Sequence, residues 1–386
     1  MEFGLSEEER MIRDMAARYA EQEAARRAAE LDEAETFDRQ SFDGMAELGF
    51  TALPWPEEAG GAGGGFAGLA LVLQELSRVS ASLGAALWAH VYLAAWPLMR
   101  FGGTEAKQRF LGRLVAGSAL GTGMLPGTAA GASRLRAGVT AARAEDGYLL
   151  EGRQTYVLGG AQAELFVVYA EMAGERIRPG SSRKRFSAFL IDRDCPGLAV
   201  QPVGRKLGLR SAGLAHLTFQ TCRVPAGNRL GREGQGSAIA RQAEAGARCG
   251  LAAVAAGIAR GAADAALGYA KARSQFGKPI AKHQAVAFLL ADMETAAEAA
   301  RLLVNQAAWR ADAGLADEGR AEMALGFAAE AALAGSIQAV QVYGGYGYMK
   351  EYPVERYMRD AKAVQMLKAF GLSPARRSTG KGSGRG

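Results

Sequence analysis

The chain has few residues of the kinds that build metal sites and hydrolytic centres. Its 386 residues include only three cysteines and three histidines. The cysteines show no metal-ligand spacing, and no histidine has a serine or cysteine partner at an informative separation along the chain. These shortages argue against a bound metal and against a hydrolytic triad, and they favour a reducing cytoplasm as the location. The cysteines are Cys195, Cys222 and Cys249.

Long apolar runs are also missing. We find no uninterrupted stretch long enough to cross a membrane, and the acidic first residues lack the basic start and apolar stretch of a secretion signal. Hydrophobic residues make up 49% of the chain and charged residues 22%, which is typical of a soluble globular protein. The length exceeds that of one small core, so we expect two or three domains.

Positive charge, in contrast, is in excess. The formal net charge is +6 and the isoelectric point is about 9.2. This balance favours acidic partners, such as a phosphate-rich cofactor, coenzyme A or an acidic carrier protein. Nucleic acid is the competing explanation, but we find no nucleic-acid-binding motif and therefore expect no such partner.

The residue pattern changes twice along the chain. Residues 1–120 show helical periodicity, whereas residues 121–225 are short runs of β-branched and aromatic residues between turn residues. Residues 226–370 are helical again and rich in small residues, which let helices pack closely, and residues 371–386 form a basic flexible tail. We therefore predict an α+β multidomain fold with an N-terminal helical domain, a central antiparallel β domain and a C-terminal four-helix-type domain.

Finer expectations concern the turns. The pair Asp146-Gly147 predicts a tight hairpin turn, and the polar stretch from Met172 to Lys184 predicts a surface loop. After Lys362 we expect only a short amphipathic piece before the tail.

Two motifs in the last third of the chain are the most specific. The first, QVYGGYGYMKEYPVERYMRDAK, begins at Gln341, where a helical run stops at two glycines that free the backbone to approach a ligand. The second, RSQFGKPI, begins at Arg273, where an arginine at a helix end beside a glycine turn is suited to grip a pyrophosphate. His283 and Gln284 follow the second motif and start the next helix.

Together these motifs resemble those of the acyl-CoA dehydrogenase family. The resemblance implies the fold order given above and an FAD-dependent oxidoreductase that forms a homodimer or homotetramer and passes electrons to an electron-transfer flavoprotein. In the family, the arginine that matches Arg273 holds the FAD pyrophosphate, often that of the neighbouring subunit. The FAD contacts implied for these motifs are Arg273, Phe276, Gln284, Gln341, Val342, Tyr343, Gly344 and Gly345.

The resemblance also places the flavin ring against the β domain. Tyr156 matches an aromatic position there and can stack on the ring. Leu158 replaces a hydroxyl residue that normally donates toward flavin N5, and Ala132 replaces a serine near the phosphate arm of the substrate, a contact that Ser133 would supply if the loop shifts by one residue. The implied ring contacts are Leu125, Thr128, Ala132, Tyr156, Val157 and Leu158.

The catalytic base is harder to place. The family reaction removes an α-proton from an acyl thioester while hydride leaves Cβ for flavin N5, and a carboxylate takes the proton. The two positions where family members carry that glutamate are Lys368 and Ala247 in this chain. Glu244, one helical turn before Ala247, is the alternative base, and Lys368 would serve only if burial strongly lowered its pKa. Arg248 is the expected substrate contact nearby.

Several readings of the function stay open. The substrate is an acyl group on coenzyme A or, in a secondary-metabolite or polyketide precursor pathway, on an acyl carrier protein. Because neither family position carries a carboxylate, a second reading is a weakly active or catalytically silent flavin-binding subunit. A third reading is a flavoprotein of the same fold with other chemistry, such as an oxidase or oxygenase.

Overall fold

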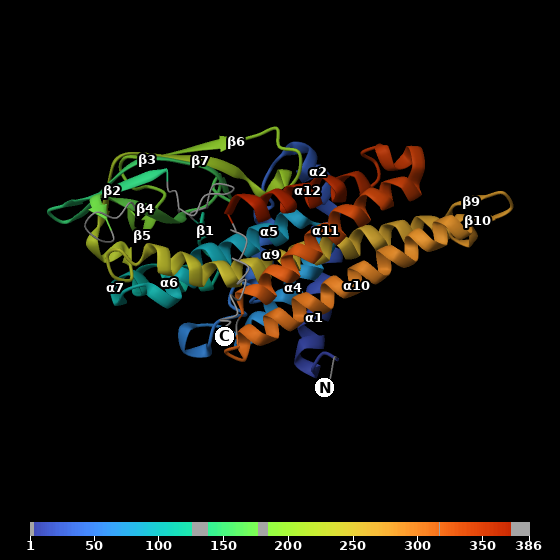
Figure 1. Ribbon diagram of the computed structural model, residues 1–386, viewed down its shortest axis with the longest axis horizontal. Helices are drawn as coiled ribbons and strands as arrows, with labels where there is room; N and C mark the ends of the chain where they lie inside the picture. Colours follow the sequence, from blue (N-terminus) through green and yellow to red (C-terminus); the bar gives the residue numbers. More distant parts are fainter. Residues whose placement is uncertain (1–3, 126–137, 177–183, 316, 372–386) are drawn as a thin grey trace, which may run out of the picture.

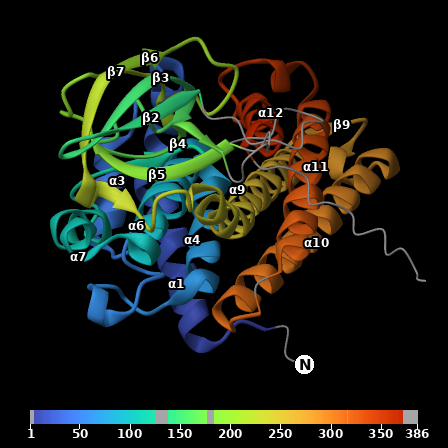
Figure 2. The same ribbon diagram turned by 60° about the vertical axis from the view of Figure 1, so that its left-hand side comes forward.

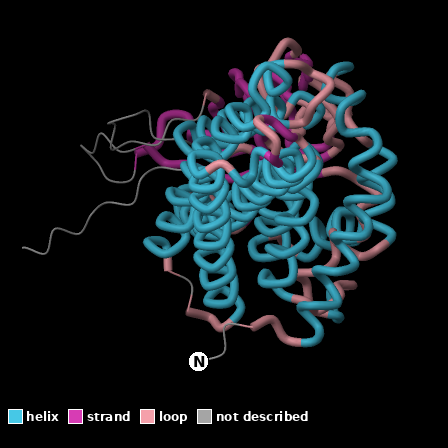
Figure 3. Tube along the Cα trace, turned by 90° about the vertical axis from the view of Figure 1, so that its right-hand side faces the viewer, coloured by secondary structure: helices cyan, strands magenta, loops and turns pink. Residues whose placement is uncertain are grey.

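The computed structural model describes residues 4–125, 138–176, 184–315 and 317–371. Helices come first, then a sheet, then longer helices, which confirms the predicted fold class (Figure 1). The first group packs under the sheet, and the last group forms the opposite flank of the molecule (Figure 2). Helices make up most of the trace (Figure 3).

The first helical group begins with a capping box. The Ser6 backbone N–H donates to the Glu9 carboxylate at 2.8 Å, and the Glu9 N–H donates to the Ser6 hydroxyl at 3.1 Å, so two end donors of the helix are satisfied. The elements of this group are α1 (Glu7–Tyr19), η1 (Ala20–Ala24), α2 (Ala25–Ala34), α3 (Arg39–Glu47), η2 (Glu57–Ala59), α4 (Gly65–Val79), α5 (Ala81–Trp88), η3 (Ala89–Ala95), α6 (Trp96–Phe101), α7 (Thr104–Ala106), η4 (Lys107–Leu111) and α8 (Gly112–Val115).

The sheet is mostly antiparallel. Its strand order is β6-β7-β3-β2-β4-β5-β8, and β1 pairs with β4 in parallel. The strands are β1 (Gly121–Gly123), β2 (Val139–Ala144), β3 (Gly147–Leu158), β4 (Leu165–Arg176), β5 (Lys184–Asp192), β6 (Leu198–Val203), β7 (Leu214–Pro225) and β8 (Arg229–Leu230), with η5 (Arg210–Ala212) and η6 (Ala226–Asn228) between them.

Two details of the β domain differ from the sequence prediction. Ala144 pairs with Gly147, so the hairpin loop is Glu145-Asp146 and Gly147 already belongs to β3. The stretch predicted as a loop from Met172 begins inside β4, because this strand continues to Arg176. Apolar and polar residues alternate only weakly in this part of β4, so its polar residues resemble those of a loop in the sequence.

The last helical group is built on α9 (Gly236–Ala272), whose 37 residues span about 55 Å at 1.5 Å per residue. Its glycines allow close helix contacts: a Cβ at Gly257 or Gly261 would collide with carbonyl oxygens at the end of α4, those of Gln74 and Arg78. The remaining elements are β9 (Ser274–Gln275), β10 (Lys278–Pro279), η7 (Ile280–Lys282), α10 (Gln284–Asp312), α11 (Glu318–Tyr343), η8 (Gly344–Tyr348) and α12 (Val354–Gly371). Helix α12 is continuous, so the short piece expected after Lys362 is the last part of this helix.

Tyr92 of η3 packs against α9 and leads to a stability prediction. Its ring stacks on Phe66 with centroids 5.6 Å apart, and only glycines at positions 246 and 250 leave room for it. Among the described residues nothing accepts or donates a hydrogen bond at the buried Tyr92 hydroxyl. Because an unpaired buried hydroxyl costs free energy, we expect Tyr92→Phe to be neutral or to raise the free energy of unfolding by about 1 kcal/mol.

The matched control is Tyr357→Phe. The Tyr357 hydroxyl donates to the Arg78 carbonyl oxygen at 2.7 Å, so its loss should lower the free energy of unfolding by about 1 kcal/mol. Urea unfolding of both variants measures the difference. Equal destabilisation by the two substitutions would contradict the assignment of Tyr92 as unpaired.

Candidate functional site

Tyr156 stands out on the sheet by its backbone and its exposure. It lies at a β-bulge between Gln154 and Val157, with φ of +61°, and its side chain is 60% exposed. A positive φ is an outlier for an aromatic residue, and bulges of this kind redirect side chains at functional sites. The Tyr156 N–H donates to His216 Nδ1 at 3.2 Å, and the two rings meet edge to face at 4.9 Å. The sheet therefore presents one aromatic ring to a partner outside it.

The neighbours of Tyr156 point inward. Val157 and Leu158 are buried, and the Leu158 carbonyl oxygen accepts a hydrogen bond from the buried Thr122 hydroxyl at 2.6 Å. The side chain and the carbonyl oxygen of Leu158 therefore both belong to the core. Leu125, two residues after β1, is also buried.

His90 fixes β1 beneath this strand end. Its Nδ1 accepts from the Gly121 N–H at 3.1 Å, so Nε2 carries the proton and donates to the Leu114 carbonyl oxygen at 2.9 Å. Complete burial lowers the pKa of His90 to about 4 and keeps the ring neutral. His90 is therefore a structural residue that positions Thr122.

Gln154 is a further polar group at this end of the sheet. Its Nε2 donates to the Met124 carbonyl oxygen at 3.3 Å, whereas its buried Oε1 has no hydrogen-bond partner in the structure described. A buried acceptor without a partner is suited to a ligand N–H or O–H. The sequence reading missed Gln154. The predicted contacts Thr128, Ala132 and Ser133 lie outside the described residues.

A second group of predicted residues forms a pocket at the far end of α9. Its volume is about 520 Å³. Gly344 ends α11 with φ of 61° and ψ of −135°, a conformation that favours glycine, and a Cβ at Gly344 or Gly345 would meet nothing within 4 Å. The pocket is lined by Tyr269, Arg273, Gln275, Ile280, Val342, Tyr343, Gly344, Gly345, Tyr346 and Met349.

Arg273 provides positive charge at this pocket. It follows α9 directly, and its guanidinium lies 5.9 Å from the Tyr346 ring centroid; no described carboxylate forms an ion pair with it. Tyr343 is held against Tyr269 by ring stacking at 4.0 Å and donates to the Ala265 carbonyl oxygen at 3.2 Å. A fixed aromatic wall, an open glycine cradle and an unpaired arginine together suit a phosphate-containing ligand.

The other predicted residues of these motifs lie around the pocket. Phe276, with φ of +53°, is 93% exposed at the tip of the β9–β10 hairpin. Gln284 is the first residue of α10, and Gln341 lies in the last turn of α11; both are exposed. Figure 1 shows the β9–β10 hairpin at one end of the long axis and most of the sheet at the other. One copy of the chain therefore does not bring the two predicted groups together.

Arg248 and Glu244 form a third group, in the first half of α9. The Arg248 side chain is only 1% exposed, and it donates to Glu244 at 2.7 Å and to Glu318 of α11 at 2.8 Å; Glu322 lies 3.7 Å away. Glu244 is 14% exposed, so its carboxylate lies mostly inside the helix interface, not on a solvent-facing side. Three carboxylates around one guanidinium offset its charge. This geometry favours Arg248 as the residue that orients Glu244.

Neither of the two positions where family members carry the catalytic glutamate holds a carboxylate in this chain: they are Ala247 and Lys368. Ala247 is fully buried, and its carbonyl oxygen accepts from Trp88 Nε1 at 2.7 Å. Lys368 lies in α12, and its side chain is outside the described part of the chain.

Three family models match the chain in order. The N-terminal, middle and C-terminal domains of acyl-CoA dehydrogenase match residues 6–118, 128–222 and 234–368. The chain belongs to the acyl-CoA dehydrogenase family. The chain is therefore an oxidoreductase of this family, as the resemblance implied.

Relatives of known name cover nearly the whole chain. An acyl-CoA dehydrogenase of Bacillus subtilis is 39% identical over 94% of each chain. A chain solved in a study of the electron transferring flavoprotein of Acidaminococcus fermentans superposes with a TM-score of 0.90 at 38% identity, over 96% of both chains. The prolyl acyl carrier protein oxidase AnaB superposes with a TM-score of 0.87 at 29% identity, over 95% of this chain and 97% of that one.

FAD is the cofactor of this family member, and the described residues fit it. The exposed ring of Tyr156 offers a stacking face, the orphaned Gln154 Oε1 offers an acceptor, and the open cradle at Gly344 lies beside the unpaired Arg273. Across the described ranges no group of three or more metal-ligating side chains is found.

Two helices of the dehydrogenase are apolar enough to span a membrane by length and composition, α9 and α11 extended to Tyr348. The sequence reading found no such run, because charged residues interrupt both. The most apolar window of α9 is 78% buried inside the protein, as in a core helix, and that of α11 is 44% buried.

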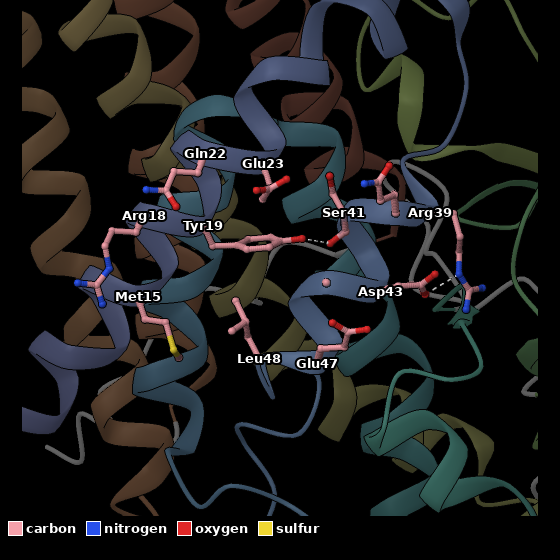
Figure 4. A pocket seen from close by; sticks show the side chains of 12 residues that line it. Met15, Arg18, Tyr19, Gln22, Glu23, Arg39, Ser41, Asp43, Glu47 and Leu48 are labelled. Atoms are coloured by element: carbon pink, nitrogen blue, oxygen red, sulfur yellow. Dashed lines mark hydrogen bonds and ion pairs between the residues drawn. The ribbon is translucent and has the colours of Figure 1, made fainter.

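Another pocket lies away from all predicted residues, between α1 and α3 (Figure 4). The Tyr19 hydroxyl bridges it by donating to the Ser41 carbonyl oxygen at 2.6 Å, and burial raises the pKa of Tyr19 to about 12. A Cβ at Gly44 would lie 2.6 Å from this hydroxyl, so the glycine makes room for the bridge. We interpret this groove as a helix-packing feature.

Asp360 connects α12 to the segment before β7, and sequence reading missed this contact. Its carboxylate is 3% exposed and accepts the Leu209 N–H at 2.6 Å. Next to it, Arg359 donates to Asp32 at 2.6 Å. These bonds join α12, α2 and the loop that leads to the strand beside Tyr156, so they position the β domain against the C-terminal helices.

This buried carboxylate predicts a pH dependence of stability. Burial raises the pKa of Asp360 to about 6. The folded chain then binds this proton more tightly than the unfolded chain. The buried carboxylate therefore lowers the free energy of unfolding most above pH 6, and this loss becomes smaller as the pH falls toward the ordinary aspartate pKa near 3.9. Asp360→Asn keeps the acceptor oxygen and removes that cost. At pH 7.5 we expect urea unfolding to give the variant a free energy of unfolding about 1–3 kcal/mol higher than that of the parent. This difference should be smaller at pH 5. A difference that is unchanged between these pH values would contradict the assignment.

Proposed function

We propose that the enzyme catalyses the α,β-dehydrogenation of an acyl thioester, with Glu244 as the base. FAD, when bound, accepts the hydride that leaves Cβ. The observation that carries the proposal is the placement of Glu244: its carboxylate is held at 2.7 Å by the buried Arg248, one turn before Ala247, a position where some family members carry the base.

Each chain residue has a separate task in this proposal. Arg248 is a positioning residue, because Glu318 and Glu322 already share its charge. Tyr156 would orient the flavin ring by stacking, and Leu158 offers that ring no side-chain hydroxyl. Lys368 remains the alternative base and would act only with a strongly lowered pKa.

We further propose that the FAD site is shared by two copies of the chain. The β9–β10 hairpin lies at the end of the molecule remote from most of the sheet (Figure 1), and Arg273, which directly precedes β9, lines one pocket with the Gly344 cradle. Helices α10 and α11 form an outer flank (Figure 2), and they expose large apolar side chains that a second copy would cover. These are Phe288, Leu302, Trp309, Met323, Phe327 and Ile337.

The acyl carrier is the finer question. The likeness to AnaB and the net charge of +6 favour a carrier protein as a second candidate beside coenzyme A. We propose an electron-transfer flavoprotein as the acceptor of the electrons from the flavin. We also propose a cytoplasmic location, and domain limits near residues 120, 225 and 370.

The test is a comparison of one acyl group presented in two ways. The FAD-loaded enzyme is mixed anaerobically with the acyl-coenzyme A ester and, separately, with the same acyl group on a carrier protein, and flavin bleaching is followed. Bleaching by either thioester supports the dehydrogenation, and the faster one identifies the carrier. No bleaching by any thioester in a panel of acyl groups would refute the proposal and favour a silent flavin-binding subunit.

A further inference from the structure

Two of the three cysteines meet at the edge of the sheet, far from each other in the sequence. Cys195 lies in the turn between β5 and β6, and Cys222 lies on β7. Their Sγ atoms are 3.2 Å apart, and Cys195 Sγ is also 3.1 Å from the Arg223 carbonyl oxygen. Forming a disulfide bond of about 2.05 Å would require the sulfurs to approach by only about 1.1 Å.

The backbone on both sides holds this approach in place. The turn is closed by the bonds Cys195 N–H to Asp192 carbonyl and Leu198 N–H to Cys195 carbonyl, both 3.0 Å. The Gln220 N–H donates to the Gly197 carbonyl at 2.8 Å, and a Cβ at Gly197 would lie 2.9 Å from Cys222 Cα. The thiol pair is therefore a consequence of strand pairing and does not depend on a mobile side chain.

The two thiols differ in access and acidity. Cys195 is partly exposed and Cys222 is buried. The hydrogen bond from the Cys222 thiol lowers the pKa of Cys195, and the same bond together with burial raises the pKa of Cys222. Cys249, in contrast, lies buried in α9, where burial raises its pKa to about 12.

We propose that Cys195 and Cys222 are a redox-active dithiol that small hydroperoxides convert to a disulfide. The Cys195 thiolate attacks one peroxide oxygen, the O–O bond breaks, and a sulfenic acid and one water form, with the second proton coming from solvent. Cys222 then loses its proton and attacks the Cys195 sulfur, the S–O bond breaks, and a second water leaves. Two thiols are oxidised and one hydrogen peroxide is reduced to two waters.

The disulfide would close a loop that contains β6, η5 and the Leu209 contact to Asp360. Because a cross-link restricts the unfolded chain, oxidation should raise the thermal midpoint. Oxidation should leave flavin reduction unchanged, because the thiol pair is far from Tyr156. Cys222 pairs with Leu150, which lies six residues before Tyr156 on β3, or about 20 Å along the strand at 3.3 Å per residue.

The experiment treats the reduced, FAD-loaded enzyme with hydrogen peroxide and then alkylates the remaining thiols under denaturing conditions. We expect mass spectrometry to show one alkylated thiol per chain in place of three, a Cys195–Cys222 cross-linked peptide, a higher thermal midpoint, and full reversal by dithiothreitol. Cys249→Ala is the matched control and should behave like the parent except that no alkylated thiol remains.

Cys195→Ser should give no cross-link and no rise in the midpoint after peroxide. Three alkylatable thiols in the treated parent would overturn the proposal, as would oxidation of Cys195 to higher acids without a cross-link. Because the peptide map is made on the unmodified chain, the result does not depend on how well the variants fold.

Discussion

Glu244→Gln should retain FAD and lose most of the anaerobic flavin reduction by acyl thioester, with a rate about 10²–10⁴-fold lower. The amide keeps the size of the side chain and its acceptor oxygen toward Arg248, but it no longer takes a proton. The loss should appear in the rate of reduction at saturating substrate, because the proton transfer itself is affected. Stopped-flow measurement of flavin bleaching gives this rate directly.

Glu318→Gln is the matched control for this prediction. Glu318 also pairs with Arg248, at 2.8 Å, but its side chain is 53% exposed and lies in the first turn of α11. We expect a rate within a few-fold of the parent, because exposed ion pairs contribute about 0–1 kcal/mol. A normal rate for Glu244→Gln would exclude it as the base, and loss of reduction in Lys368→Met would then place the base on α12.

Arg273→Ala should weaken FAD binding by about 10- to 100-fold, because a charge-assisted hydrogen bond contributes about 1.5–3 kcal/mol. Equilibrium titration of the apoprotein with FAD measures the change. Lys278→Ala is the control: Lys278 is an exposed cation on the same hairpin, outside the pocket. Equal losses for both variants would show that general positive charge, not the Arg273 contact, holds the cofactor.

A mixing experiment separates a shared FAD site from one within a single copy. If two copies share the site, Arg273→Ala and Tyr156→Ala damage opposite halves of it. Mixed oligomers of the two variants then contain one site with both halves intact, and part of the tight FAD binding returns. No recovery in mixed oligomers of confirmed composition would contradict the shared site.

The sequence predicted those parts of the site that lie in continuous motifs. The turns at Arg273 and Gly344 are local in the chain, and their glycines indicate special backbone conformations. The β-bulge at Tyr156 was not predicted. The fold class was confirmed for the same reason, since periodicity and turn residues act over short distances.

The contacts that position the site were not predictable in this way. Thr122 reaches Leu158 across 36 residues, Arg248 reaches Glu318 across 70, and Leu209 reaches Asp360 across 151. Each joins an ordinary polar residue to a partner that only the tertiary structure brings near. Arg248 in particular has the pattern of a surface helix charge until α11 covers it.

The most direct test of the account is the absorption spectrum of the purified protein, taken anaerobically before and after an acyl thioester is added. We expect a yellow protein, or one that becomes yellow with FAD, whose flavin band bleaches in proportion to the thioester. A protein that stays colourless when FAD is supplied would contradict the flavin site and the function built on it.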